Sequence, residues 1–142
     1  MSYLLDTNVV SELRKGERTD PNVASWFAGI SPESIYISVL TVGEIRKGIE
    51  KIRPRDEAAA KSLDSWLKSL LEANADRILP IDQAIAERWG HDNVADPLPV
   101  LDSLLAATAR VHDLTLVTRN IKDVKRSGVT LLNPFDFQPK VP

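Results

Sequence analysis

The 142-residue chain contains no cysteine. This excludes a disulfide, a thiolate nucleophile and a zinc site built on sulfur ligands. Any bound metal ion would therefore be held by oxygen ligands or by the two histidines, His91 and His112, which do not form a metal-ligand pair in the sequence. A metal site in this protein is expected to consist of carboxylates.

Long apolar runs are also missing. No stretch approaches the roughly 18 apolar residues that a membrane span requires, and the first residues do not form a secretory signal. We therefore expect a cytoplasmic protein with no membrane partner. The formal net charge of −2 argues against binding nucleic acid through bulk positive charge, so a nucleic-acid partner would need a local basic patch.

Several catalytic and nucleotide-binding motifs are absent. The chain has neither of the two glycine-rich phosphate-binding loops, G-x-x-x-x-G-K-[ST] and G-x-G-x-x-G. Its serines occur in no G-x-S-x-G turn, which leaves a serine hydrolase without a motif. These absences direct attention to the acidic residues.

Short apolar segments alternate with segments of helical periodicity along the whole chain. Alternation of this kind, with nearly continuous apolar strands, is typical of a parallel sheet covered on both faces. The sequence therefore predicts an α/β fold in one domain, residues 1–137, followed by a loose tail, 138–142. The expected strands are 3–5, 34–39, 78–81, 114–117 and 130–132, and the expected helices are 8–14, 21–30, 41–53, 55–74, 82–89 and 102–112.

Three acids lie where expected strands end or the following helices begin. Asp6 follows the first strand, Glu44 lies near the start of the helix after the second, and Asp102 begins the helix before the fourth. Ligands of open α/β sheets bind at the carboxyl ends of the strands. Each acid also has a purely structural interpretation: a helix cap for Asp6 and Asp102, and a capping box with Thr41 for Glu44.

If the three carboxylates converge, their mutual repulsion should raise their pKa values and destabilise the site unless a divalent cation compensates. Mg²⁺ and Mn²⁺ prefer carboxylate oxygen and water, and they often bind together with a substrate phosphate. Such an ion can polarise a phosphodiester and lower the pKa of a bound water. The acids therefore suggest metal-dependent phosphodiester chemistry.

Five segments together resemble the PIN-domain nucleases, in particular the VapC-type toxins of the FitB-like branch. They are YLLDTNVVSEL at 3–13, ISVLTVGEIRKGI at 37–49, LDSLLAATA at 101–109, LTLVTRNIKDV at 114–124 and LLNPF at 131–135. The resemblance implies a PIN-like three-layer sandwich with a mainly parallel sheet. It also implies an endoribonuclease whose Mg²⁺, or alternatively Mn²⁺, is held by Asp6, Glu44 and Asp102.

Other positions follow from the same resemblance. Many family members carry a fourth acid where this chain has Asn120. Either Asn120, as a neutral ligand, or Asp123 is expected to complete the site, although Asp123 is equally explained as a cap of the short helix near Ile121. Thr7, Asn8 and Ser38 would hold waters or orient carboxylates, although turn and helix-start hydrogen bonding explains them equally well.

A local run of basic residues follows Glu44, and two further basic residues follow the fourth strand. These residues are candidates for contacts with the RNA backbone, although a solvated helix face is the more common role of such a run. They are Arg46 and Lys47, with Lys51, Arg53 and Arg55 beyond them, and Arg119 and Lys122.

Toxins of this family are usually neutralised by a small antitoxin that also links the pair to operator DNA, and a homodimer is expected by the same analogy. An antitoxin helix would need an exposed apolar groove, which the residues Val9, Val10, Leu13, Trp26 and Phe27 are expected to supply. On that basis Trp26→Ala should weaken antitoxin binding more than it lowers folding stability. Two other functions remain open: a non-catalytic PIN-like binding module, and a receiver-like phosphotransfer domain that also uses Mg²⁺.

Overall fold

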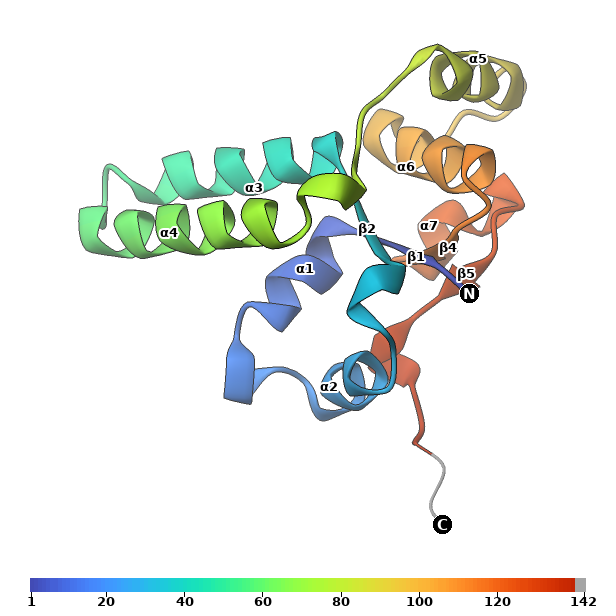
Figure 1. Ribbon diagram of the computed structural model, residues 1–142. Helices are drawn as coiled ribbons and strands as arrows, with labels where there is room; N and C mark the ends of the chain where they lie inside the picture. Colours follow the sequence, from blue (N-terminus) through green and yellow to red (C-terminus); the bar gives the residue numbers. More distant parts are fainter. Residues whose placement is uncertain (140–142) are drawn as a thin grey trace.

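The computed structural model describes residues 1–139 and contains a five-stranded sheet at its centre (Figure 1). Every strand pair is parallel, and the strand order is β3-β2-β1-β4-β5. The predicted α/β class is confirmed, and the sheet that was expected to be mainly parallel is parallel throughout. The strands are β1 (Tyr3–Leu5), β2 (Ile35–Ser38), β3 (Ile78–Leu79), β4 (Thr115–Val117) and β5 (Leu131–Leu132).

The first strand of the chain is the middle strand of the sheet. β1 pairs with β2 on one side and with β4 on the other. Because successive side chains of a strand point to opposite faces, Leu4 and Leu5 enter two different cores. Both are buried, so β1 has the near-continuous apolar character that a strand covered on both faces requires.

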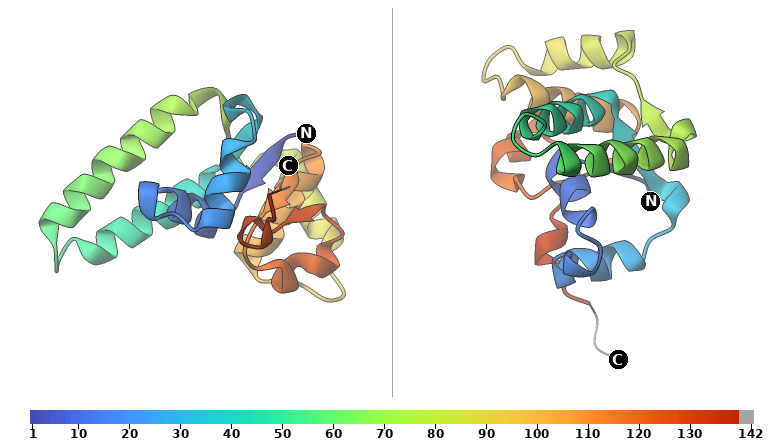
Figure 2. Two further views of the ribbon diagram at one scale, coloured as in Figure 1. Left: turned by 90° about the horizontal axis from the view of Figure 1, so that it is seen from below. Right: turned by 90° about the vertical axis from the view of Figure 1, so that its left-hand side faces the viewer.

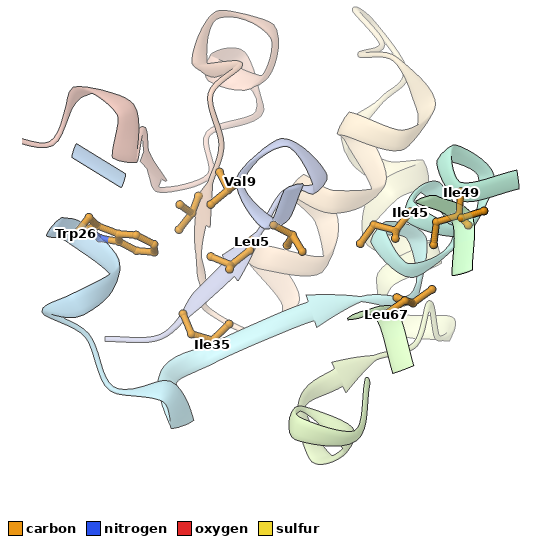
Figure 3. Packing of buried hydrophobic residues seen from close by; sticks show 10 residues of the cluster. Leu5, Val9, Trp26, Ile35, Ile45, Ile49 and Leu67 are labelled. Carbon is orange, nitrogen blue, oxygen red and sulfur yellow. The ribbon is translucent and has the colours of Figure 1, made fainter. Parts of the chain in front are cut away.

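Four helices cover one face of the sheet: α1 (Thr7–Leu13), α2 (Pro21–Ala28), α3 (Val39–Ile52) and α4 (Glu57–Ala73). Their apolar stripes pack on Leu5 and on the β2 and β4 side chains of that face (Figure 3). The labelled residues of this cluster are Leu5, Val9, Trp26, Ile35, Ile45, Ile49 and Leu67.

Two helices cover the opposite face, α6 (Val100–Val111) and the short α7 (Ile121–Val124). The alanine-rich α6 packs against Leu4, Leu116 and Val124 in the second core. Outside it lies α5 (Gln83–Asp92), which is tied to α6 by the bond from Trp89 Nε1 to Ser103 Oγ at 2.8 Å. The layers are therefore helices, sheet and helices, as the resemblance implied.

The helices α3 and α4 run antiparallel as a hairpin that projects from the sheet (Figures 1 and 2). Buried residues of both helices hold the hairpin together from inside. On its surface Asp64 of α4 accepts bonds from Arg46 at 2.7 Å and Arg53 at 2.9 Å, both from the α3 side. The base of this hairpin carries one of the three predicted site acids, Glu44.

Trp26 and Val9 are core residues, contrary to their predicted place in an exposed groove. Val9 is fully buried, and Trp26 is 4% exposed and packs edge-on against Tyr3 with ring centroids 5.3 Å apart. Phe27, the next residue of α2, is 38% exposed. The helical period explains the difference, because α2 already turns Val23 and Trp26 inward.

Helix starts follow the expected capping chemistry in most places. Asp20 caps α2 before Pro21, and Asp82 caps α5, as predicted. Three starts differ from the predictions by two residues: α3 begins at Val39 rather than near Thr41, α4 begins at Glu57 with Asp56 as its cap, and α6 begins at Val100 with Pro99 at the cap position. Short 3₁₀ turns join the elements at Gly16–Arg18, Pro32–Ser34, Ala75–Arg77, Lys125–Ser127 and Pro134–Asp136.

Of the predicted tail, 138–142, only Gln138 and Pro139 belong to the described part of the chain, where they have no regular structure. Residues 140–142 lie outside the described residues. Within residues 1–139, every helix is too short or too polar to cross a membrane.

Candidate functional site

Asp6 lies at the carboxyl end of the central strand and caps α1. Its amide continues the ladder to Val117 O at 2.9 Å, while its Oδ1 accepts the Thr7 amide at 2.7 Å. Its Oδ2 accepts the Thr118 hydroxyl at 2.8 Å and, more weakly, the side-chain Nδ2 of Asn8 at 3.4 Å. Asp6 is only 8% exposed. The capping interpretation is therefore confirmed, and the same bonds hold a nearly buried carboxylate at the edge of the sheet.

Glu44 is the sixth residue of α3, so the predicted capping box is wrong. The cap of this helix is Ser38, whose Oγ accepts the Leu40 amide at 3.0 Å. The Thr41 hydroxyl is buried and lacks a hydrogen-bond partner among the described residues. The Glu44 carboxylate points instead to α1, where its Oε1 accepts the Thr7 hydroxyl at 2.7 Å.

Asp102 lies in the first turn of α6, and the interpretation of this residue as a helix cap is wrong. Pro99 occupies the cap position, and no side chain bonds to the first amides there. Burial raises the pKa of the Asp102 carboxyl above its usual value, and the charges of Asp6, Asp123 and Glu44 raise it further. The direction of the pKa shift is what burial and neighbouring carboxylates both produce.

The three acids line one open hollow of about 310 Å³ at the carboxyl edge of the sheet. Asn120, which follows β4, lines the same hollow, and its amide donates to Thr118 Oγ1 at 3.0 Å. Asp123 is exposed in α7 and acts on Asp102 through its charge. The remaining lining residues are Thr7, Asn8 and Leu101. Ser38 is fully buried at the start of α3 and is not part of this lining.

The donor set of the hollow suits a hard cation, because it consists of carboxylate, amide and hydroxyl oxygens. No three Asp, Glu, His or Cys side chains within residues 1–139 lie close enough to enclose an ion as they stand. Mg²⁺ keeps several waters and is commonly bound through one or two carboxylates. The residues therefore fit an ion that is held by few direct bonds and by water.

Thr118 was not predicted as a site residue. It is 1% exposed, and its hydroxyl donates to Asp6 while accepting from the Asn120 amide. One buried hydroxyl thus fixes the positions of two residues of the hollow. The only hint in the sequence was a polar residue directly after an apolar strand, which is too common a pattern to single out.

The predicted basic residues have different surroundings. Arg46 is paired with Glu50 at 3.1 Å and Asp64 at 2.7 Å, so much of its charge is compensated. The Arg119 guanidinium lies over the Phe135 ring, 4.4 Å from the centroid, and the Arg119 amide donates to Asn8 Oδ1 at 3.2 Å. Lys47 and Lys122 are exposed.

Replacing Asp102 with asparagine should raise the melting temperature of the metal-free protein at neutral pH. The raised pKa means that ionisation of Asp102 costs more in the folded than in the unfolded chain, so stability is lost as pH rises through the interval above about 3.9, the usual value. The variant should melt a few degrees higher than the wild type at pH 7 in EDTA and at the same temperature below about pH 4. Thermal unfolding at the two pH values measures both.

The exposed Glu87→Gln in α5 is the control for this comparison, because it removes an equal charge away from the hollow. It should leave the melting temperature nearly unchanged at both pH values. A lower melting temperature for Asp102→Asn at pH 7 would show that the carboxylate stabilises the fold.

The fold and the acidic hollow together define the class of protein: an α/β protein with strand order 3-2-1-4-5 and a group of carboxylates beside the central strand. Comparison with known proteins shows to which family within this class the chain belongs. A sequence profile described as PIN domain matches residues 3–126. The chain is 31% identical to Toxin FitB from Neisseria gonorrhoeae over 141 residues, covering 93% of this chain and 97% of that protein. It is 30% identical to VapC ribonuclease Y4jK from Sinorhizobium fredii over 139 residues, covering 94% and 97%.

Among solved structures, a chain of FitAB bound to an IR36 DNA fragment superposes with a TM-score of 0.87 at 28% identity, covering 96% of this chain and 98% of that chain. The protein belongs to the PIN-domain family, within the group that contains the FitB and VapC toxins of toxin–antitoxin systems. The resemblance inferred from the five sequence segments is thereby confirmed.

Proposed function

We propose that the protein is a metal-dependent endoribonuclease and the toxin of a toxin–antitoxin pair, with Mg²⁺ as its ion and Mn²⁺ as an alternative. The observation that carries the proposal is the meeting of Asp6, Glu44 and Asp102, from three separate segments, around one hollow. Burial raises the pKa of Asp102, and the charges of Asp6 and Glu44 raise it further, as expected for carboxylates that share one hollow. Membership of a family that includes proteins named ribonucleases supports the same reaction.

In this proposal Asp6, Glu44 and Asp102 hold the ion, and Asn120 supplies a neutral fourth oxygen while Asp123 contributes charge from outside. The ion, when bound, would polarise the phosphodiester and lower the pKa of a water. Thr7 restrains Glu44, and Thr118 restrains Asp6 and Asn120, so the oxygens keep their positions before an ion arrives.

An RNA backbone must approach an acidic hollow, so positive side chains near it would reduce the repulsion. We assign this role to Lys47, Arg119 and Lys122. Arg46 contributes less because two carboxylates already compensate its charge. Asn8 and Ser38 support the proposed site by hydrogen bonds to the backbone of Arg119 and Leu40 respectively.

The proposed partner is an antitoxin that inserts an amphipathic segment into an apolar groove of about 280 Å³ between α1, α2 and α4. Val10, Leu13 and Phe27, all predicted as groove residues, line it, together with Trp66 and Leu70. FitAB bound to a DNA fragment is the precedent for a partner that contacts operator DNA. A homodimer and a cytoplasmic location are proposed from family analogy alone.

Cleavage of a total RNA pool by the purified, antitoxin-free protein tests the proposal. Cutting is expected with Mg²⁺ or Mn²⁺ and should stop with EDTA. Because a nuclease with one preferred target can leave most of a pool intact, calorimetric titration with Mn²⁺ accompanies the assay. If the protein neither cuts RNA nor binds Mn²⁺, it is a non-catalytic PIN-like module instead.

A further inference from the structure

A second hollow adjoins the acidic one. It has a volume of about 170 Å³ and lies between α1 and the α3–α4 hairpin, which are neighbours in the fold (Figure 1). Thr7 and Glu44 line both hollows. Because these two side chains are joined by a 2.7 Å hydrogen bond, they form the wall between the side pocket and the other two acids, Asp6 and Asp102.

The side pocket differs chemically from the acidic hollow. Its walls are mostly apolar, formed by Ile45, Ile49, Ile52 and Leu63. The half-buried Trp66 also lines it, and the exposed Arg14 and Ser11 lie on its α1 side. An indole and aliphatic walls suit a flat aromatic group, and the guanidinium suits a negative charge attached to that group.

We infer that this side pocket holds the nucleobase of a nucleotide next to the phosphate that is cleaved. The inference rests on the proposed function, since it takes the acidic hollow as the place of that phosphate. Recognition of single-stranded RNA commonly uses bases that are stacked on aromatic or guanidinium groups. Here Trp66 supplies the aromatic group, and Arg14 faces the negative charge of the nucleotide.

The position of the pocket favours a base over a protein segment. The groove between α1, α2 and α4 is larger and already offers the row of apolar contacts that an amphipathic helix needs. The side pocket shares Arg14 and Trp66 with that groove, but it differs from the groove in sharing Thr7 and Glu44 with the acidic hollow. A group bound there lies directly beside whatever the acids bind.

Gly48 provides a way to fill the pocket without disturbing the acids. It lies inside α3 on the pocket lining, and a Cβ at this position would meet no heavy atom within 4 Å. Gly48→Leu should therefore place its side chain in the pocket with little strain, and leucine also favours the helix more than glycine does. Gly90→Leu in α5 is the matched control, because Gly90 faces equally open space away from the pocket.

The test measures binding of the four 5′-mononucleotides and of ribose 5-phosphate in the presence of Mn²⁺, by calorimetry. These probes contain no internucleotide bond, so the measurement does not depend on cleavage. At least one mononucleotide should bind about tenfold more tightly than ribose 5-phosphate, which is the effect of one well-stacked base. Gly48→Leu should abolish this preference without changing the Mn²⁺ affinity or lowering the melting temperature, and Gly90→Leu should keep the preference.

Equal binding of the mononucleotides and ribose 5-phosphate by the wild type would overturn the inference. So would an unchanged base preference in Gly48→Leu; weaker antitoxin binding by that variant would then assign the pocket to the partner protein. RNA cleavage by the wild type is scored separately. Base preference without RNA cleavage and without Mn²⁺ binding would retain the pocket as a nucleotide site and reject the nuclease. Cleavage without base preference would retain the nuclease and reject the pocket.

Discussion

Asp6→Asn is expected to lower the rate of RNA cleavage by at least about 100-fold, because substitutions of groups that merely support a metal ligand already cost about 10- to 100-fold. Asparagine has the shape of aspartate and also caps helices well, so it can still accept the Thr7 amide. What it lacks is the negative charge. The variant should therefore fold normally, bind Mn²⁺ weakly and cleave poorly, as measured by thermal unfolding, calorimetry and an RNA cleavage assay.

Asp113→Asn is the control for Asp6→Asn. Asp113 is exposed, outside the hollow, and has a positive φ of 53° that asparagine adopts as readily. It should cleave RNA at the wild-type rate. Wild-type cleavage by Asp6→Asn as well would reduce Asp6 to a helix cap and remove the basis of the proposed nuclease.

Trp26→Ala should destabilise the protein by about 3–5 kcal/mol, the usual cost of truncating a large buried aromatic residue. The indole is 4% exposed and packs on Tyr3 and on the cluster around Leu5 and Val9. Denaturant unfolding of the two proteins measures the difference. This expectation reverses the one drawn from the sequence, in which antitoxin binding was the property most affected.

Phe27→Ala is the natural comparison, since it truncates an aromatic side chain one residue further along the same helix. Phe27 is 38% exposed and lines the apolar groove, so its loss should cost only about 1 kcal/mol of stability. Titration with the antitoxin should show weaker binding. Equal destabilisation by the two variants, or full antitoxin affinity in Phe27→Ala, would contradict the proposed docking of the partner in this groove.

The order and type of the main elements could be predicted from the sequence because each has a local cause. Asp20 before Pro21 starts a helix wherever it occurs, and the apolar run after Ser2 has the composition of a buried strand. The identity of the three acids was also accessible, since parallel strands bring their carboxyl ends to one edge. The sequence predicted that these acids lie at the same edge of the sheet, and this position depends only on the topology of the sheet.

The contacts of those acids were not predictable in the same way. Ser38 and Thr41 are both reasonable helix caps, and the structure uses Ser38, which leaves Glu44 too far into α3 to form a capping box. Trp26 and Phe27 are adjacent aromatic residues, and only the packing of α2 decides which of them is buried. The hydrogen bond between Asp6 and Thr118 joins residues 112 positions apart, so no local sequence pattern could predict it.

The hydrogen bond between Asp6 and Thr118 also determines when the site can form during synthesis of the chain. Asp6 is synthesised 112 residues before Thr118, but its strand lies between β2 and β4 and its carboxylate is held by Thr118. Asp102 and Asn120 likewise belong to the last third of the chain. A growing chain therefore contains its first acid long before it has a site. In the toxin that we propose, activity therefore begins only after Thr118 has been synthesised and has bonded to Asp6.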